Sequence, residues 1–216
     1  VALSHTRDLV EIPFNEQGAD HVCEPTGVFL TDGKIQPHLK AGAKKASDSN
    51  CVSCVSCTTN GLAPMVKAIN DAFGIERGLI TTIHAMTAYQ PTVDGASKKD
   101  WCGCRTKPGN ICPSSSGAVK AKAKVVPKLA GKLTDMAFRV PTIDVSVVDI
   151  TCELEKATNY EDICAKTKRL SEGDMKRFLG YCDESLVSTD FKTRPISSTI
   201  DSKAVIMRDC KLVDGA

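Results

Sequence analysis

The spacing of apolar residues predicts one long amphipathic helix in the first half of the chain. Between residues 58 and 73, apolar side chains recur at intervals of three and four, at Leu62, Met65, Val66, Ile69 and Phe73. This spacing places them on one face of an α-helix. Gly74 follows directly and predicts the end of the helix. Pro64 lies inside the stretch, and we expect it to kink the helix without breaking it.

Three later stretches are rich in β-branched residues and predict strands. They are GLITTIHAMT (78–87), MAFRVPT (136–142) and IDVSVVDITCEL (143–154). Residues 88–113 show no period and hold three Pro and three Gly. We expect a long loop there, and such a loop in a compact domain is usually functional. Two or three short strands are expected in the tail of the chain.

Other segments predict shorter elements. A strand is expected at 21–30, and helices at 32–45 and 114–129. Thr158 and Glu161 have the spacing of a capping box. The helix that they predict carries an inward face and ends at a glycine: Ile163, Thr167, Leu170 and then Gly173.

These elements favour an α+β fold with helices and a largely antiparallel or mixed sheet, because strands and helices do not alternate regularly. The stretch before residue 46 instead has the character of a remnant of a more α/β-like unit. We therefore divide the chain into two parts, residues 1–50 and residues 51–216.

Composition excludes several classes of protein. A net charge of +2 over 216 residues argues against a specific nucleic-acid partner, and no apolar run approaches the roughly 20 residues of a membrane span. The N-terminus lacks the pattern of a signal peptide, and its first residue, Val1, suggests a fragment or a processed product. The number of cysteines, eleven, is odd, which favours reduced thiols in the cytoplasm. Several are expected in the core: Cys23, Cys152, Cys164 and Cys182.

Cys51, Cys54 and Cys57 stand at equal spacing and raise two hypotheses. Such an array can hold an iron–sulfur cluster or a metal ion, with Cys102 and Cys104 as further candidate ligands. However, the chain enters a helix directly after the third cysteine, and a second CxxC pair is absent. We favour no metal site, and keep a metal-binding module as the weaker hypothesis.

The second hypothesis makes Cys57 a nucleophile. Its position before the predicted helix exposes the sulfur to unpaired N–H groups and a positive dipole end, which would lower the pKa of the thiol. His84 ends a predicted strand where a loop begins, a usual position for a catalytic side chain. Cys57 and His84 are therefore the best candidates for a nucleophile and its base.

Several motifs together resemble the NAD-dependent, phosphorylating glyceraldehyde-3-phosphate dehydrogenases. They are SCTTN followed by LAP, TTIHAMTAYQPTVDG, PSSSGAVKA, MAFRVPT, VSVVDITCELEK, GYCDESLVSTDF and SSTIDSKA. They occur in the order of that family and cover residues 56 to about 206. Residues 1–45 are more loosely similar to the late part of the family's Rossmann-like NAD-binding domain. The resemblance implies that residues 1–50 are a remnant of that domain and that residues 51–216 form the catalytic domain.

The resemblance implies a glycolytic oxidoreductase that converts glyceraldehyde 3-phosphate, NAD and inorganic phosphate to 1,3-bisphosphoglycerate and NADH. Cys57 would attack the aldehyde and carry a thioester, and His84 would hold the thiolate and take a proton. Two anion sites would bind phosphate groups, and a homotetramer is implied. The residues implied for one anion site are Ser56, Thr58, Ser116 and Gly117. Those implied for the other are Thr87 and Arg139.

The sequence also departs from that family. The Gly-rich dinucleotide fingerprint and the acidic residue that binds the ribose are absent. Only Arg7 and Thr26 match cofactor-binding positions, so we expect this chain to bind NAD weakly. An alternative function follows, in which the chain is a catalytically impaired, truncated relative that acts as a binding or redox-responsive protein.

Overall fold

The computed structural model describes residues 3–19, 22, 32–42, 56–88, 90–97, 101–114, 126–207 and 211–215. The chain separates into two compact units, Val1–Cys57 and Thr58–Ala216. The division therefore falls at the first residue of a helix, and each unit is described by itself.

The first unit contains two described helices. A 3-10 helix, η1, spans Leu9–Glu11, and its first turn is capped by Asp8, whose side chain accepts a hydrogen bond from the Val10 N–H at 3.0 Å. Helix α1 spans Asp32–Lys40, which confirms the helix predicted from residue 32. The strand predicted at 21–30 lies almost entirely outside the described residues.

The second unit opens with a helix that is followed by a strand of opposite direction. Helix α2 spans Cys57–Phe73 and strand β1 spans Ile75–His84. Gly74 joins them with a φ of 71°, a conformation that favours glycine. The predicted helix is confirmed. The strand predicted at 78–87 begins three residues earlier and ends at His84, because the backbone beyond it hydrogen-bonds to a neighbouring loop instead of a strand.

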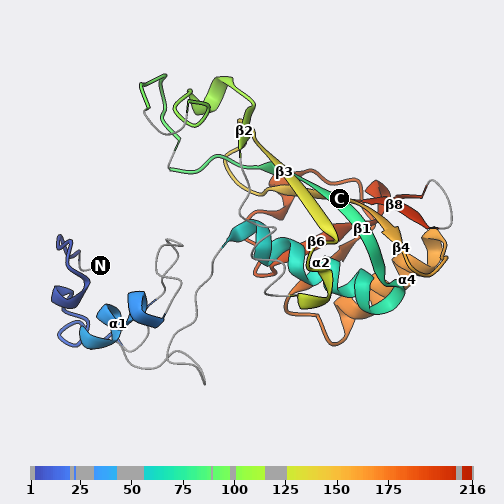
Figure 1. The fold of residues 1–216 in the computed structure, drawn as a ribbon, viewed down its shortest axis with the longest axis horizontal. Coiled ribbons are helices and arrows are strands. Elements are labelled where there is room, and N and C mark those ends of the chain that lie inside the picture. The colour runs from blue at the N-terminus through green and yellow to red at the C-terminus, as the bar shows by residue number, and fades with distance from the viewer. Residues whose placement is uncertain are drawn as a thin grey trace. The chain divides into compact units, whose positions relative to one another are not determined.

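A mixed sheet forms the centre of the second unit, with the strand order β2-β3-β1-β4-β8-β7. Strands β1 and β3 are parallel and the other neighbours are antiparallel. Figure 1 shows β1, β3 and β4 as its long strands. The bounds are Cys112–Ser114 for β2, Leu133–Arg139 for β3, Val147–Leu154 for β4, Ile206–Met207 for β7 and Leu212–Gly215 for β8. The α+β prediction with a mixed sheet is confirmed.

Helix α4, Tyr160–Glu172, and a second, two-stranded parallel sheet complete the described elements. The helix cap differs from the prediction: Asn159 caps α4, accepting a hydrogen bond from the Asp162 N–H at 2.7 Å, in place of Thr158. The end at Gly173 is confirmed. The second sheet pairs β5 (Leu179–Cys182) with β6 (Ser198–Asp201). Short 3-10 helices span Lys107–Gly109, Pro127–Leu129, Ser188–Phe191 and Ser202–Ala204.

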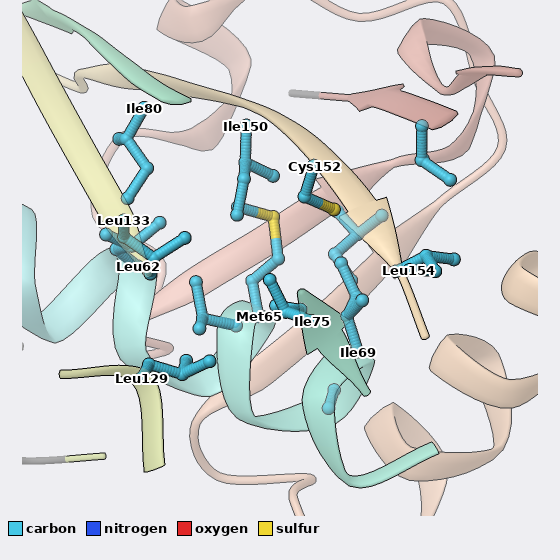
Figure 2. Packing of buried hydrophobic residues seen from close by; sticks show 14 of the residues in the cluster. Leu62, Met65, Ile69, Ile75, Ile80, Leu129, Leu133, Ile150, Cys152 and Leu154 are labelled. Atoms are coloured by element: carbon cyan, nitrogen blue, oxygen red, sulfur yellow. The ribbon is translucent and has the colours of Figure 1, made fainter. Parts of the chain in front are cut away.

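The core lies between one face of the six-stranded sheet and the layer that holds α2, α4 and the small sheet. Figure 2 shows Leu62, Met65 and Ile69 of α2 pointing toward side chains of the sheet. Their partners across the layer include Ile80, Ile150, Cys152 and Leu154. Burying each such large apolar side chain stabilises the fold by roughly 1.5–3 kcal/mol.

The opposite face of the sheet is partly exposed. Leu79, Met136 and Val147 are 38%, 42% and 37% exposed, and strand alternation places them on the face away from Ile80 and Ile150. Of the helices that the structure describes, none has the length and apolar character needed to cross a membrane.

Candidate functional site at the ends of β1 and β3

Two residues predicted for the site end neighbouring parallel strands. His84 is the last residue of β1, Arg139 is the last residue of β3, and they are direct register partners. Side chains alternate along a strand, so His84 shares the face of Thr82, which is 1% exposed, and Arg139 shares the face of Ala137, which is 9% exposed. Both candidate side chains therefore project from the face of the sheet that α2 covers, and both are half-buried.

Arg139 connects the candidate base to a threonine. Its Nη1 lies 3.2 Å from His84 Nδ1 and 3.4 Å from Thr87 Oγ1. His84 Nδ1 is also 2.6 Å from the carbonyl oxygen of Ala85. A guanidinium only donates and a carbonyl only accepts hydrogen bonds, so Nδ1 can hydrogen-bond to only one of these two neighbours at a time. The contact with the Ala85 carbonyl is the shorter one, and it is made by the tautomer that carries its proton on Nδ1. In the neutral ring, Nε2 is then the nitrogen with the lone pair, and it can accept a proton.

Thr87 is held by a residue that the sequence analysis missed. Gln90 is 3% exposed, its Oε1 accepts a hydrogen bond from the Thr87 N–H at 3.2 Å, and its own N–H donates to the Thr87 carbonyl at 3.1 Å. This reciprocal pair fixes the turn that brings the Thr87 hydroxyl to Arg139. Buried polar side chains are usually hydrogen-bonded, so the burial of Gln90 in the structure points to a supporting role. The sequence alone does not show that Gln90 is buried.

A second support comes from the loop before β4. Ser146 Oγ accepts a hydrogen bond from the Ala85 N–H at 3.0 Å, and the Thr142 carbonyl accepts one from the Met86 N–H at 2.8 Å. The neighbouring Val145 has a φ of 64°, which is an unusual conformation for a β-branched residue. These contacts explain why the segment after His84 leaves the sheet and turns toward Arg139.

The candidate nucleophile begins α2. Cys57 is the first residue of the helix and is exposed. The first N–H groups of a helix have no partner within the helix, which makes this position electropositive. Ser56 precedes it and is half-buried, and Thr58 is 8% exposed. The structure thus brings together His84, Arg139 and Thr87, and it places Thr58 in the first turn of α2.

The structure says less about the other predicted site residues. Ser116, Gly117 and Thr26 lie outside the described residues, as do Cys51 and Cys54. Arg7 is exposed in the first unit. Within the described ranges, no group of three or more His, Cys, Asp or Glu residues could hold a metal ion.

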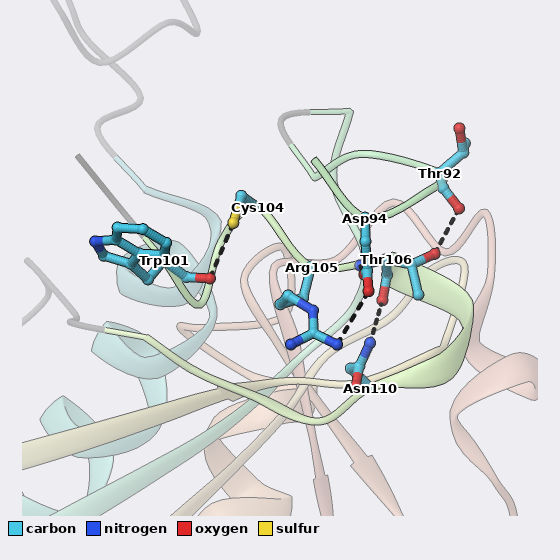
Figure 3. Close-up of polar contacts among 7 residues, drawn as sticks. All are labelled: Thr92, Asp94, Trp101, Cys104, Arg105, Thr106 and Asn110. Atoms are coloured by element: carbon cyan, nitrogen blue, oxygen red, sulfur yellow. Dashed lines mark hydrogen bonds and ion pairs between the residues drawn. The ribbon is translucent and has the colours of Figure 1, made fainter. Parts of the chain in front are cut away.

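The long loop before β2 has a polar network of its own, shown in Figure 3. Arg105 and Asp94 form an ion pair at 3.0 Å. The hydrogen bond from Arg105, followed by one from the Thr106 N–H, lowers the pKa of Asp94 below its ordinary value. The same pair raises the pKa of Arg105. These contacts connect Asp94 with Arg105 and Thr106, which lie eleven and twelve residues further along the loop.

Comparisons with known proteins agree with the fold and with the motifs. A family model described as the C-terminal domain of glyceraldehyde 3-phosphate dehydrogenase matches residues 56–214. The chloroplastic glyceraldehyde-3-phosphate dehydrogenase of Guillardia theta is 54% identical over 99% of this chain and 61% of its own length. The cytosolic enzyme of Scenedesmus vacuolatus is also 54% identical, over 93% of this chain and 72% of its own. A relative from Ogataea parapolymorpha is 52% identical, over 93% of this chain and 67% of its own.

The chain therefore spans less than two thirds of the length of the Guillardia theta protein that it matches. The alignment with that protein covers 236 positions, more than the 216 residues of this chain, so the relative carries at least 20 residues that this chain lacks within the aligned region. Identity above one half over nearly the whole chain confirms the resemblance drawn from the motifs. The chain belongs to the glyceraldehyde-3-phosphate dehydrogenase family.

Proposed function

We propose that this chain carries out the thiol and phosphate-binding chemistry of a phosphorylating glyceraldehyde-3-phosphate dehydrogenase in glycolysis. The whole reaction converts glyceraldehyde 3-phosphate, inorganic phosphate and NAD to 1,3-bisphosphoglycerate and NADH. The observation that carries the proposal is the contact of Arg139 with both His84 and Thr87. It joins a candidate proton acceptor to a cationic anion site at one end of the sheet.

The covalent step begins at Cys57. Its sulfur adds to the carbonyl carbon of the aldehyde, and the oxygen that becomes negative is stabilised by N–H groups at the start of α2. In the tautomer whose Nδ1–H donates to the Ala85 carbonyl, His84 receives the thiol proton at Nε2 and passes it to that oxygen, which gives a thiohemiacetal. Conversion of the thiohemiacetal to a thioester needs a hydride acceptor, which NAD would supply in the whole enzyme. Inorganic phosphate then attacks the thioester and releases the Cys57 thiolate. The chain reverses direction at Gly74, so the end of β1 returns toward the start of α2, where Thr58 lies. This reversal supports the proposed pairing of Cys57 with His84.

Two anion sites accompany the thiol. Arg139 and Thr87 form the first, in which the guanidinium and the hydroxyl donate hydrogen bonds to phosphate oxygens. Ser56, Thr58, Ser116 and Gly117 are proposed for the second, through hydroxyl groups and backbone N–H groups at helix starts. The half-buried position of Arg139 favours the first site, because a partly desolvated charge attracts an anion more strongly than an exposed one.

NAD is the hydride acceptor of this family, and we keep it as the cofactor of the whole enzyme, with Arg7 and Thr26 as its candidate contacts. Arg7 is exposed, and Thr26 lies outside the described residues. A dinucleotide site requires glycine turns at the ends of strands, and no step through NAD is assigned to the described residues of the first unit. The second candidate function is that of a catalytically impaired relative that binds ligands or responds to redox conditions.

The exposed face of the sheet supports the proposal of a homotetramer. Leu79, Met136 and Val147 lie on three neighbouring strands, and a second copy of the chain could cover them. We keep the cytoplasm as the proposed location; the relatives that match include a cytosolic and a chloroplastic protein.

The test separates thiol chemistry from complete turnover. The purified chain is mixed with glyceraldehyde 3-phosphate, and the alkylation of Cys57 by iodoacetamide is followed with and without the aldehyde. Protection of Cys57 supports the thiohemiacetal step, for which no cofactor is needed. Adding NAD and phosphate then shows whether NADH forms. Protection without NADH identifies the impaired relative, and unprotected Cys57 together with absent NADH contradicts the proposed function.

A further inference from the structure

The tip of the loop before β2 carries two cysteines separated by one glycine, in the sequence Trp101-Cys-Gly-Cys-Arg105. Two arms of the loop are joined below this tip. The Gly95 N–H donates to the Cys104 carbonyl at 3.1 Å, and the Thr106 N–H donates to Asp94 Oδ1 at 2.8 Å. Figure 3 shows Asp94 and Thr106, the residues of the second bond, together with Trp101 and Cys104 of the tip. The backbone of Cys104 is therefore held in place.

The tip itself is a tight turn. The Arg105 N–H donates to the Cys102 carbonyl at 3.2 Å, so Cys102 and Cys104 are the first and third residues of a hydrogen-bonded turn. Two Cα–Cα steps of about 3.8 Å, folded by a turn, bring the Cα atoms into the roughly 4.4–6.8 Å range that a disulfide bridges. The turn thus meets the Cα–Cα requirement of a disulfide between these two residues.

The two thiols differ in their surroundings. Cys102 is exposed. Cys104 is half-buried, and its Sγ donates a hydrogen bond to the Trp101 carbonyl at 3.0 Å. An exposed thiol is the more accessible nucleophile, while a sheltered neighbour is suited to attack the first sulfur once that has reacted.

A positive charge stands beside the pair. The pKa of Arg105 is raised chiefly by its hydrogen bond with Asp94, with smaller contributions from the Cys104 and Cys112 sulfurs. Arg105 follows Cys104 directly in the chain, so its positive charge lies next to the dithiol in the sequence. Metal binding is the less suitable role, since a tetrahedral zinc site needs four ligands and no third Cys, His, Asp or Glu joins these two in the described part of the chain.

We propose that Cys102 and Cys104 form a dithiol site that exchanges with low-molecular-weight disulfides and closes into an intramolecular disulfide. This site is separate from Cys57 and does not depend on the proposed dehydrogenase chemistry. The redox partner is a small disulfide such as oxidised glutathione.

The reaction balances in two exchange steps. The Cys102 thiolate attacks one sulfur of the small disulfide, a mixed disulfide forms, and one small thiolate leaves. The Cys104 thiolate then attacks the Cys102 sulfur, closing the ring and releasing the second small thiolate. The protein dithiol loses two electrons and two protons, and the small disulfide takes them up as two thiols. In the disulfide product Cys104 has no S–H group, so its hydrogen bond to the Trp101 carbonyl is lost.

The sequence provides a direct readout. Trypsin cleaves after Lys99 and Arg105, which releases Asp-Trp-Cys-Gly-Cys-Arg, a peptide that holds both cysteines and no other. The folded chain is equilibrated with glutathione buffers of increasing oxidising strength, quenched in acid, unfolded, alkylated and digested. We expect this peptide to lose both alkyl groups together and to become two hydrogens lighter. Trp101 is the single tryptophan of the chain, and its fluorescence should fall over the same range of buffers, because a disulfide quenches an adjacent indole.

Variants distinguish the pair from general thiol oxidation. Cys104→Ser should stop at a mixed disulfide on Cys102, and Cys102→Ser should abolish ring closure. Cys164→Ser, at a half-buried cysteine of α4, should leave the behaviour of the peptide unchanged. Two alkylated cysteines under every buffer, a glutathione adduct without ring closure in the unmodified chain, or a link from this peptide to another cysteine would each overturn the proposal.

Discussion

Arg139 Nη1 lies 3.2 Å from Nδ1 of His84 although 55 residues separate them in the sequence. The parallel pairing of β1 with β3 creates this contact, because both residues are the last of their strands and stand in register. The same guanidinium reaches Thr87 at 3.4 Å. The proposed proton acceptor and the proposed anion-binding cation therefore lie next to each other at the end of the sheet, and substitutions can separate their contributions.

His84 should control the reactivity of Cys57. If its Nε2 accepts the thiol proton, His84→Ala should slow alkylation of Cys57 by iodoacetamide at neutral pH. Loss of a general base typically slows a reaction by about 100-fold or more. His5→Ala removes an exposed histidine of the first unit and should have no effect. Labelling is measured by mass spectrometry on each cysteine peptide. Faster labelling of Cys102 than of Cys57 in the folded chain would show that Cys57 is not the most reactive thiol.

Arg139 should govern phosphate affinity and not thiol reactivity. Arg139→Ala removes a charge-assisted contact, and the expected loss is about 1.5–3 kcal/mol, roughly 10- to 100-fold in the affinity for glyceraldehyde 3-phosphate. Alkylation of Cys57 should change far less. Arg77→Ala is the matched control, because Arg77 is exposed on β1 and pairs with Glu153 at 2.7 Å. Unchanged substrate affinity in Arg139→Ala would remove this residue from the site.

Gln90 should act through Thr87. Gln90→Ala leaves the Thr87 N–H without its acceptor in a buried turn, a change that typically costs about 1–3 kcal/mol. We expect the affinity for inorganic phosphate or substrate to fall in the same direction as in Thr87→Val. Asn110→Ala removes a comparable amide-to-backbone bond elsewhere in the loop, from Asn110 Nδ2 to the Thr106 carbonyl at 3.1 Å, and should leave affinity unchanged. A purely structural role for Gln90 would lower the unfolding midpoint without changing affinity.

The parts of this fold that local patterns encode could be predicted from the sequence. The apolar period of α2 and the β-branched run of β1 are properties of neighbouring residues. By contrast, the contact between His84 and Arg139 depends on which strands pair, and that is decided by packing over a long separation. Gln90 stands in a segment with no period, so its burial gave no signal. Thr158 and Asn159 are both good caps by residue type, and only the backbone conformation at Asn159 decides between them.

Glu155 should make stability depend on pH. The hydrogen bond from Lys132, at 2.9 Å, lowers the pKa of Glu155 from its ordinary value of 4.5. A carboxyl whose pKa is lower in the folded state stabilises the fold above its unfolded pKa, and loses that contribution as the pH falls through the folded value. Glu155→Gln should therefore lower the urea midpoint at neutral pH, and the difference from the unmodified chain should shrink below about pH 4.5.

The size of this effect is limited because the pair is exposed to solvent, where salt screens the charges. Glu184→Gln makes the same change of charge at an exposed carboxylate after β5 and serves as the control. A difference between Glu155→Gln and the unmodified chain that persists unchanged into acid would show that the ion pair with Lys132 is not its origin.

Val145 should be a position where substitution stabilises the chain. Its φ of 64° places a β-branched residue in the left-handed region, which costs about 1–2 kcal/mol for a residue with a side chain of this kind. Asparagine adopts this region more readily, so Val145→Asn should raise the free energy of unfolding by up to about 1 kcal/mol. Val145→Ile keeps the branching and should give no gain. Val145→Gly should gain less than asparagine, because glycine also raises the entropy of the unfolded chain.

Urea unfolding measures the three variants, and phosphate affinity tests whether the strained turn matters for the site. The left-handed turn at Val145 precedes Ser146, whose hydroxyl accepts from the Ala85 N–H beside His84. Val145→Asn preserves that turn, so stability should rise while phosphate affinity stays the same. If Val145→Asn is instead less stable than Val145→Ile, the apolar packing of this half-buried side chain outweighs its backbone strain.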